Sequence, residues 1–226
     1  MNELVMARAR LRRDVPAVAF AALLVPEDAD EQFGASHRLL WSLYADAPNR
    51  PRDFLWRQTR SGEFLILGQR VPVDTHGLFD MDHKPFAPEL RPGDRLGFSL
   101  RANATVSRPT ARGQRGVRHD VVIDLLRRTP GPRSDVRHDV TQAAGRDWLA
   151  RQGEAHGFVL RGDFVVDGYD RVTMPRQSAK PAVFGVLDMS GVLEVTDPER
   201  FLAKLAQGFG KAKAFGCGLM LIRRVS

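Results

Sequence analysis

The chain has 226 residues, of which 43% are hydrophobic and 27% are charged, so it can bury one large core or two small ones. Its single cysteine, Cys217, excludes a disulfide framework and a cysteine-based metal site. No apolar stretch approaches the ~18 residues that a membrane-spanning helix needs, and residues 1–13 lack the apolar block of a signal peptide. We therefore expect a cytoplasmic protein.

Positive charge dominates the ionisable residues. Lysine and arginine number 34 against 27 aspartates and glutamates, a formal net charge of +7. A basic domain attracts polyanions, which favours nucleic acid first and an acidic membrane second. A basic surface that is merely solvated is the alternative.

The first half of the chain predicts one helix among several strands. The segment FGASHRLLWSLY (33–44) has leucines at helical spacing, with Ser36 as a candidate N-cap and His37 in the first turn. Alternating apolar residues, and paired apolar runs around Ser61-Gly62, predict strands at 4–11, 54–58, 63–69 and 95–104.

The second half begins with a basic segment, SRPTARGQRGVR (107–118), whose arginines and glycines predict a flexible loop or an extended hairpin. A helix is predicted at Val121–Leu126, and the prolines within 129–133 mark a soft boundary. The remaining predicted strands, two of them joined by a tight turn at Ser190-Gly191, are 164–167, 182–189, 191–196 and 219–222.

The segment TDPERFLAKLAQG (196–208) is the clearest helix in the sequence. Asp197 suits the N-cap, Pro198 the first helical position and Gly208 the C-terminal cap. The predicted order is strand, helix and two strands, followed by a second set of strands with a helix before the last strand. This order favours an α+β fold that can be built from two related βαββ-type halves.

A glycine-rich basic stretch, QGFGKAKAFGCGLML (207–221), follows that helix. A dinucleotide fold places its glycines after a strand and before a helix, whereas here the order is helix, glycines, strand. Lys213 stands where the third glycine of G-x-G-x-x-G belongs, and the P-loop pattern is not matched. Contact with a nucleic-acid backbone is favoured over a nucleotide cofactor, with a purely structural turn as the alternative.

The glycine-rich stretch resembles the C-terminal motif of the CRISPR-associated Cas6 superfamily of repeat-RNA endonucleases, and more narrowly the CasE family of subtype I-E systems. HRLLWSLYADAPNRPRDFLWR (37–57) is similar to the family's histidine-containing helix and the strand after it. LRPGDRLGFSLRANAT (90–105) resembles a further family strand, with Thr105 where proline is usual, and VLEVTDPERFLAKLAQG (192–208) resembles the strand and helix before the glycines. Residues 106–180 match poorly.

The resemblance implies an α+β fold of two tandem ferredoxin-like (RRM-like) domains. We expect an N-terminal domain at 1–105 that bears the histidine helix, a basic loop and linker at 106–135, and a C-terminal domain at 136–226 that bears the glycine-rich loop. It also implies metal-independent cleavage of CRISPR precursor RNA at the base of the repeat hairpin. The ribose 2′-OH attacks the adjacent phosphate and leaves a 2′,3′-cyclic phosphate.

The implied partners are the repeat RNA hairpin and the other subunits of the Cascade complex, in which the protein stays bound to the mature guide RNA. No cofactor, metal or membrane is implied. A non-catalytic subunit that binds the hairpin with the same fold is the alternative. An enzyme that uses the glycine-rich loop for a phosphorylated small molecule is a third reading.

His37 matches the family's catalytic histidine, and an imidazole can move a proton near neutral pH. Without the resemblance, a histidine that begins a helix is more often a surface or capping residue. The family commonly has a tyrosine three residues earlier, where this chain has Gly34 beside Phe33. Tyr44, two helical turns after His37, is therefore a possible second proton-transfer group, unless it packs in the core.

Arginine, lysine and glycine residues of the two basic segments and the histidine helix are candidates for RNA binding, because guanidinium and ammonium groups suit phosphates. They are Arg38, Arg108, Arg112, Arg115, Arg118, Gly208, Gly210, Lys211, Lys213 and Gly216. A solvated loop is the alternative for the arginines.

The other histidines suggest little chemistry. His76 and His83 lie among aspartates, but no regular spacing directs them to one metal ion. His119, His138 and His156 are expected to face solvent.

Overall fold

The computed structural model describes residues 3–14, 36–37, 39–44, 52–109, 116–174 and 181–225. The strands are β1 (Val5–Leu11), β2 (Phe54–Arg60), β3 (Glu63–Gly68), β4 (Phe79–Pro85), β5 (Arg95–Ala102), β6 (Thr105–Arg108), β7 (Val117–Asp120), β8 (Phe158–Met174), β9 (Ala182–Val195) and β10 (Met220–Arg224). The helices with assigned bounds are α3 (Val121–Leu126), α4 (Arg133–His156), α5 (Pro198–Gln207) and the short 3₁₀ helices η1 (Ser42–Tyr44) and η2 (Lys213–Phe215). Residues 36–37 and 39–41 are also helical.

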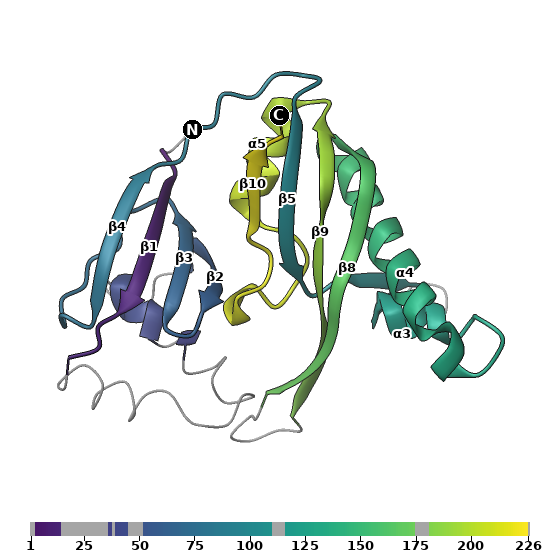
Figure 1. Ribbon diagram of the computed structural model, residues 1–226. Coiled ribbons are helices and arrows are strands. Elements are labelled where there is room, and N and C mark those ends of the chain that lie inside the picture. The colour runs from purple at the N-terminus through teal and green to yellow at the C-terminus, as the bar shows by residue number, and fades with distance from the viewer. Residues whose placement is uncertain are drawn as a thin grey trace.

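Two four-stranded antiparallel sheets stand side by side (Figure 1). Their strand orders are β2-β3-β1-β4 and β10-β5-β9-β8, while β6 and β7 form a separate hairpin. Both sheets thus have the ferredoxin-like order, in which the first and third strands are central. The predicted α+β fold with two tandem ferredoxin-like domains is confirmed. The N-terminal domain departs from the pattern because the described residues 69–78, between β3 and β4, contain no helix.

The predicted domain boundary at residue 105 is wrong. Strand β5 pairs with β9 over its whole length and with β10, so it is the first strand of the C-terminal sheet. Within the predicted basic loop and linker at 106–135, α3 confirms the helix predicted at Val121–Leu126, and β6 and β7 form the extended hairpin that was one of the two alternatives for the basic segment. The prediction assigned β5 to the N-terminal domain because the sequence indicates that a strand exists but not which strand it pairs with.

The 24-residue helix α4 escaped sequence analysis. Its buried face is sparse and includes Val140, Ala144, Gly145 and Trp148 between long charged residues, so no apolar stripe is visible. Small residues are needed on this face: a Cβ on Gly145 would lie 2.7 Å from the Val166 side chain. The helix therefore packs closely on β8 without an amphipathic pattern.

The predicted tight turn at Ser190-Gly191 is also wrong, because both residues lie inside the continuous strand β9. Gly191 pairs with Phe98 on one side and with Phe164 on the other. A Cβ there would lie 2.7 Å from the carbonyl oxygen of Asp163, beside a bulge in β8. The glycine thus serves close strand approach rather than a turn.

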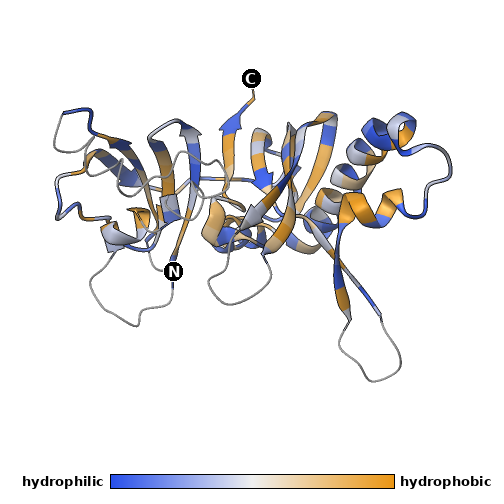
Figure 2. Cartoon of the chain, turned by 90° about the horizontal axis from the view of Figure 1, so that it is seen from below, coloured by the Kyte–Doolittle hydropathy of each residue, from blue (hydrophilic) through white to orange (hydrophobic). Residues whose placement is uncertain are grey.

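Each sheet has its own hydrophobic core. The hydrophobic residues, coloured orange in Figure 2, lie on the strands and helices of both domains. A third apolar cluster joins the two domains and contains Leu55, Leu67 and Leu219. Beside it, Arg57 of β2 donates to the Ser99 hydroxyl of β5 at 2.9 Å. The apolar contact and this polar contact bring β2 of the N-terminal sheet against the C-terminal domain.

Candidate catalytic and nucleic-acid-binding site

The glycine-rich loop between α5 and β10 is fixed by hydrogen bonds to β5 and the residue after it. Asp197 caps α5 by accepting from the Arg200 amide at 3.0 Å, and the helix ends at Gly208, as predicted. The Lys211 amide donates to the carbonyl of Asn103 at 3.0 Å, and the Gly218 amide donates to the carbonyl of Arg101 at 2.7 Å. The loop is therefore a rigid element.

Asn103 is the central residue in these contacts between the loop and the sheet. Its buried side-chain amide donates to the Gly185 carbonyl of β9 at 2.7 Å, while its backbone accepts from the loop. One residue thus ties β9 and the glycine-rich loop to the end of β5. The sequence hinted at Asn103 only through the family-like motif around it.

The glycines of the loop make room for neighbouring groups. A Cβ on Gly208 would lie 2.8 Å from the Leu55 side chain, and one on Gly216 would lie 3.0 Å from the Trp56 ring. Gly208 and Gly216 are both buried. These two predicted RNA-binding residues therefore serve packing against β2, while Gly210 is half-buried and Lys211 is exposed.

We predict that Gly210→Ala destabilises the protein more than Gly162→Ala. Both glycines have positive φ, 69° and 59°, so both substitutions carry the cost of the left-handed backbone region. Only at Gly210 would the new Cβ also meet a backbone atom, the Asn103 oxygen at 2.5 Å. We expect Gly210→Ala to lower the free energy of unfolding by about 1–3 kcal/mol more than the control, measured by urea denaturation. Equal losses would contradict the close contact.

Strand β2 lies along the loop and orients it. The Trp56 indole N–H donates to the Ala214 carbonyl at 3.2 Å. Ala214 belongs to η2, the one helical turn inside the loop. The N-terminal domain therefore holds the loop through an indole that is itself almost fully buried.

His37 reaches the same turn from the helical segment at 36–41. Its ring centroid lies 6.4 Å from that of Phe215 in η2 and 6.0 Å from that of Trp41. The side chain is half-buried, and its Nδ1 atom is covered. The predicted catalytic histidine and the glycine-rich loop, which lie near opposite ends of the sequence, are thus side by side in the structure.

Tyr44 is placed in the N-terminal core. It is 4% exposed, and its ring stacks on that of Phe54 at 4.3 Å. Burial, followed by the charge of Asp53, raises the pKa of its hydroxyl further above the ordinary value. This environment disfavours the predicted proton-transfer role, because burial keeps the hydroxyl from the surface that RNA can reach and favours its neutral form.

We predict that Tyr44→Phe leaves RNA cleavage unchanged. The substitution keeps the ring stack with Phe54 and removes only the hydroxyl. A group that transfers a proton in the transition state would cost roughly 10²–10⁴-fold in rate when removed. Single-turnover cleavage of a labelled repeat hairpin measures the difference, and a loss of that size would restore Tyr44 as a catalytic group.

Cations gather where β2 meets the loop. Burial, then the charges of Arg52 and Lys211, lower the pKa of Lys213. Burial, then Lys213 and Lys211, lower the pKa of Lys204 in the last turn of α5. Four positive side chains from three segments of the chain therefore share one region. Sequence analysis named two of them, Lys211 and Lys213.

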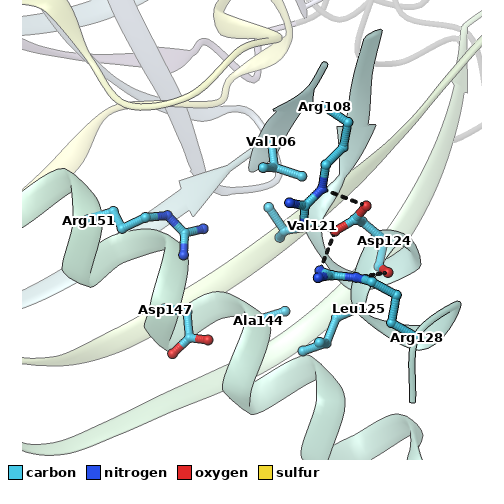
Figure 3. A pocket seen from close by; sticks show the side chains of 9 residues that line it. All are labelled: Val106, Arg108, Val121, Asp124, Leu125, Arg128, Ala144, Asp147 and Arg151. Carbon is cyan, nitrogen blue, oxygen red and sulfur yellow. Dashed lines mark hydrogen bonds and ion pairs between the residues drawn. The ribbon is translucent and has the colours of Figure 1, made fainter. Parts of the chain in front are cut away.

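A carboxylate of α3 binds the basic hairpin β6–β7. Arg108, a predicted RNA-binding residue, donates to Asp124 of α3 at 2.6 and 3.2 Å, and Arg128 donates to the same carboxylate (Figure 3). These hydrogen bonds, with the charges of both arginines, hold the pKa of Asp124 below its usual range. Arg108 thus positions the hairpin. The predicted residues Arg38, Arg112 and Arg115 lie outside the described residues.

A second basic surface lies at the base of the hairpin. A hollow of about 220 Å³ is lined by the exposed residues Arg118, Arg127 and Arg171 and by Phe184 of β9. The Phe184 ring lies 5.7 Å from that of Phe215. Two successive ring contacts, Phe184 with Phe215 and Phe215 with His37, therefore lead from this hollow to the place where His37 meets η2.

The aspartates around His76 and His83 have other contacts. Asp74 accepts from the backbone amides of His76 and Phe79, and Asp82 pairs with Arg8. Within the described ranges, no group of three or more His, Cys, Asp or Glu side chains is arranged to hold a metal ion. Cys217 is a buried free thiol whose pKa burial raises to about 12. None of the helices in the described ranges is both long and apolar enough to cross a bilayer.

Comparison with known proteins places this arrangement among CRISPR proteins. The chain matches the family described as CRISPR associated protein over residues 6–224. It is 35% identical to CRISPR-associated endoribonuclease Cse3 of Thermus thermophilus over 149 residues, which cover 62% of this chain and 60% of that relative. It is 25% identical to CRISPR system Cascade subunit CasE of Escherichia coli (strain K12) over 189 residues, 81% of this chain and 88% of that protein.

The three-dimensional similarity extends over the whole chain. A structure of CRISPR endoribonuclease Cse3 bound to a 19 nt RNA superposes with a TM-score of 0.70 at 26% identity. The superposition covers 99% of both chains, so it includes both sheets and the region that sequence analysis matched poorly.

Proposed function

The chain belongs to the CRISPR-associated protein family that it matches over residues 6–224, and we propose on that premise that it is an endoribonuclease. It cuts CRISPR precursor RNA at the base of the repeat hairpin without a metal ion. Its relatives are named as a CRISPR endoribonuclease and a Cascade subunit. One contact carries the proposal for this chain, the approach of the His37 ring to Phe215 in the glycine-rich loop.

In the proposed reaction, the ribose 2′-OH attacks the adjacent phosphorus and the 5′-oxygen of the next nucleotide leaves. The products are a 2′,3′-cyclic phosphate and a 5′-OH. His37 accepts or supplies the proton that this exchange requires. Because Nδ1 is covered, we assign proton transfer to Nε2. The rings of Trp41 and Phe215 hold the imidazole in place.

The cations beside His37 stabilise the charge that develops on the phosphate. A pentavalent phosphorane carries more negative charge than the ground state, so fixed positive groups favour the transition state. Lys213 is suited to this role because its Nζ is already oriented by the Gln207 carbonyl at 2.5 Å.

The RNA stem extends in the proposal from His37 toward the base of the β6–β7 hairpin. Arg118, Arg127 and Arg171 line the hollow at that base, and duplex RNA is recognised largely through its backbone and shape. After cleavage, the chain keeps the hairpin and joins Cascade, in the cytoplasm, where a free buried thiol such as Cys217 is stable.

The test is to mix the chain with its labelled repeat RNA in EDTA. We expect one cut on the 3′ side of the stem. Phosphatase should release phosphate from the new 3′ end only after acid has opened the 2′,3′-cyclic phosphate. Tight binding without a product favours the non-catalytic RNA-binding subunit instead. That alternative is supported by the burial of Tyr44, which disfavours it as the predicted second proton-transfer group.

A further inference from the structure

Arg52 is a residue that neither sequence analysis nor the family resemblance assigned to the site. It lies two residues before β2, the strand whose Leu55 and Trp56 contact the glycine-rich loop. Phe54, at the start of β2, lies 5.4 Å from Trp41, and Trp41 lies 6.0 Å from His37. The beginning of β2 is thus close both to the histidine helix and to η2.

The guanidinium of Arg52 lacks a counter-charge within the part of the chain that the structure describes. Its Nη1 atom is covered and has no hydrogen-bond acceptor among the described residues. Burial lowers the pKa of Arg52, and no described carboxylate contributes to its pKa or to that of Lys213. A covered guanidinium nitrogen without an acceptor costs free energy, and neighbouring ammonium groups add repulsion. An anion that enters the cluster removes both costs.

We propose that Arg52 and Lys213 form a clamp for the scissile phosphate, with Lys211 at its exposed side. The inference rests on the proposed function and adds a catalytic residue to it. A guanidinium donates two parallel hydrogen bonds to phosphate oxygens, whereas an ammonium acts as a point charge. Arg52 therefore orients the phosphate, and Lys213 neutralises it next to His37.

The clamp also explains why the two domains must meet here. Arg52 comes from the N-terminal domain, whereas Lys211 and Lys213 come from the C-terminal domain. The indole hydrogen bond from Trp56 to Ala214 joins β2, which follows Arg52, to η2, which contains Lys213. Neither domain alone holds the phosphate from both sides.

The experiment compares two product hairpins that differ only at the end left by cleavage, one with a 3′-phosphate and one with a 3′-OH. The wild-type chain is expected to bind the phosphorylated hairpin roughly 10-fold more tightly, the usual scale of charge-assisted hydrogen bonds. In Arg52→Ala, the ratio of the two affinities should fall toward one, while the affinity for the 3′-OH hairpin should stay at the wild-type value. Arg52→Lys should retain part of the preference, and it replaces Arg52→Ala as the test variant if Arg52→Ala does not fold.

The matched control is Arg91→Ala, which removes an exposed arginine from the turn before β5 and should keep the full preference. The proposal is overturned if Arg52→Ala retains the preference, if it weakens both hairpins equally, or if the wild-type chain shows no preference. A wild-type chain that prefers the phosphate but never cleaves RNA would contradict the proposed function and leave the clamp supported. A chain that binds neither hairpin would contradict both.

Discussion

Replacing His37 with alanine is expected to lower the single-turnover rate of repeat-RNA cleavage by about 10²–10⁴-fold, the usual contribution of a positioned proton-transfer group. Folding should be little affected, because the ring is half-buried and lies tilted, not stacked, against the rings of Trp41 and Phe215. Affinity for a hairpin with a 2′-deoxyribose at the cleavage site should be nearly unchanged. A rapid-quench time course and a filter-binding titration measure the two quantities.

His138→Ala is the control for this prediction. His138 is an exposed imidazole on α4, on the side of the C-terminal sheet away from the N-terminal domain (Figure 1). Its removal should leave the cleavage rate unchanged. If His37→Ala cuts RNA at the wild-type rate, His37 is not the proton-transfer group, even if the chain still binds the hairpin.

Salt is expected to weaken hairpin binding by about 10³-fold between 50 and 200 mM, because roughly six phosphate contacts release their counterions. Basic residues of the cation cluster and of the hollow at the base of the hairpin supply these contacts in the proposal. They are Arg52, Arg118, Arg127, Arg171, Lys211 and Lys213. Equilibrium titrations over a series of salt concentrations give the slope of log K against log salt concentration.

Single substitutions then separate the contacts. Arg118→Ala and Arg171→Ala should each reduce the slope by about one, whereas Arg91→Ala should leave it unchanged. A flat salt dependence in the wild-type chain would contradict recognition of an RNA backbone. It would favour the reading in which the glycine-rich loop serves a phosphorylated small molecule.

Local patterns in the sequence predicted local structure well. The capped helix α5 and the hairpin of β2 and β3 appear as expected, because Asp197, Pro198 and the Ser61-Gly62 turn act on their own neighbourhood. The helix α4 was not predicted, because the reason for its small buried residues is visible only where they pack against β8. Strand pairing, such as that of β5 with β9, likewise depends on partners distant in sequence.

The site could be predicted only in part for the same reason. His37, Lys211 and Lys213 were identified through motifs, and the structure places His37 against Phe215 of η2, the turn that begins at Lys213. Arg52 was missed because an arginine before a strand is unremarkable until burial and neighbouring cations are known. The glycines were predicted to bind RNA, and the sequence did not show that Gly208 and Gly216 also leave room for Leu55 and Trp56 of β2.

The most direct measurement is a crystal structure of the chain with a repeat hairpin whose scissile ribose lacks the 2′-OH. Convergence of His37 and the glycine-rich loop on one phosphate predicts that this phosphate lies between the imidazole and Lys213, within hydrogen-bond distance of Arg52. An intact hairpin bound over α4, with its scissile phosphate remote from η2, would contradict the account.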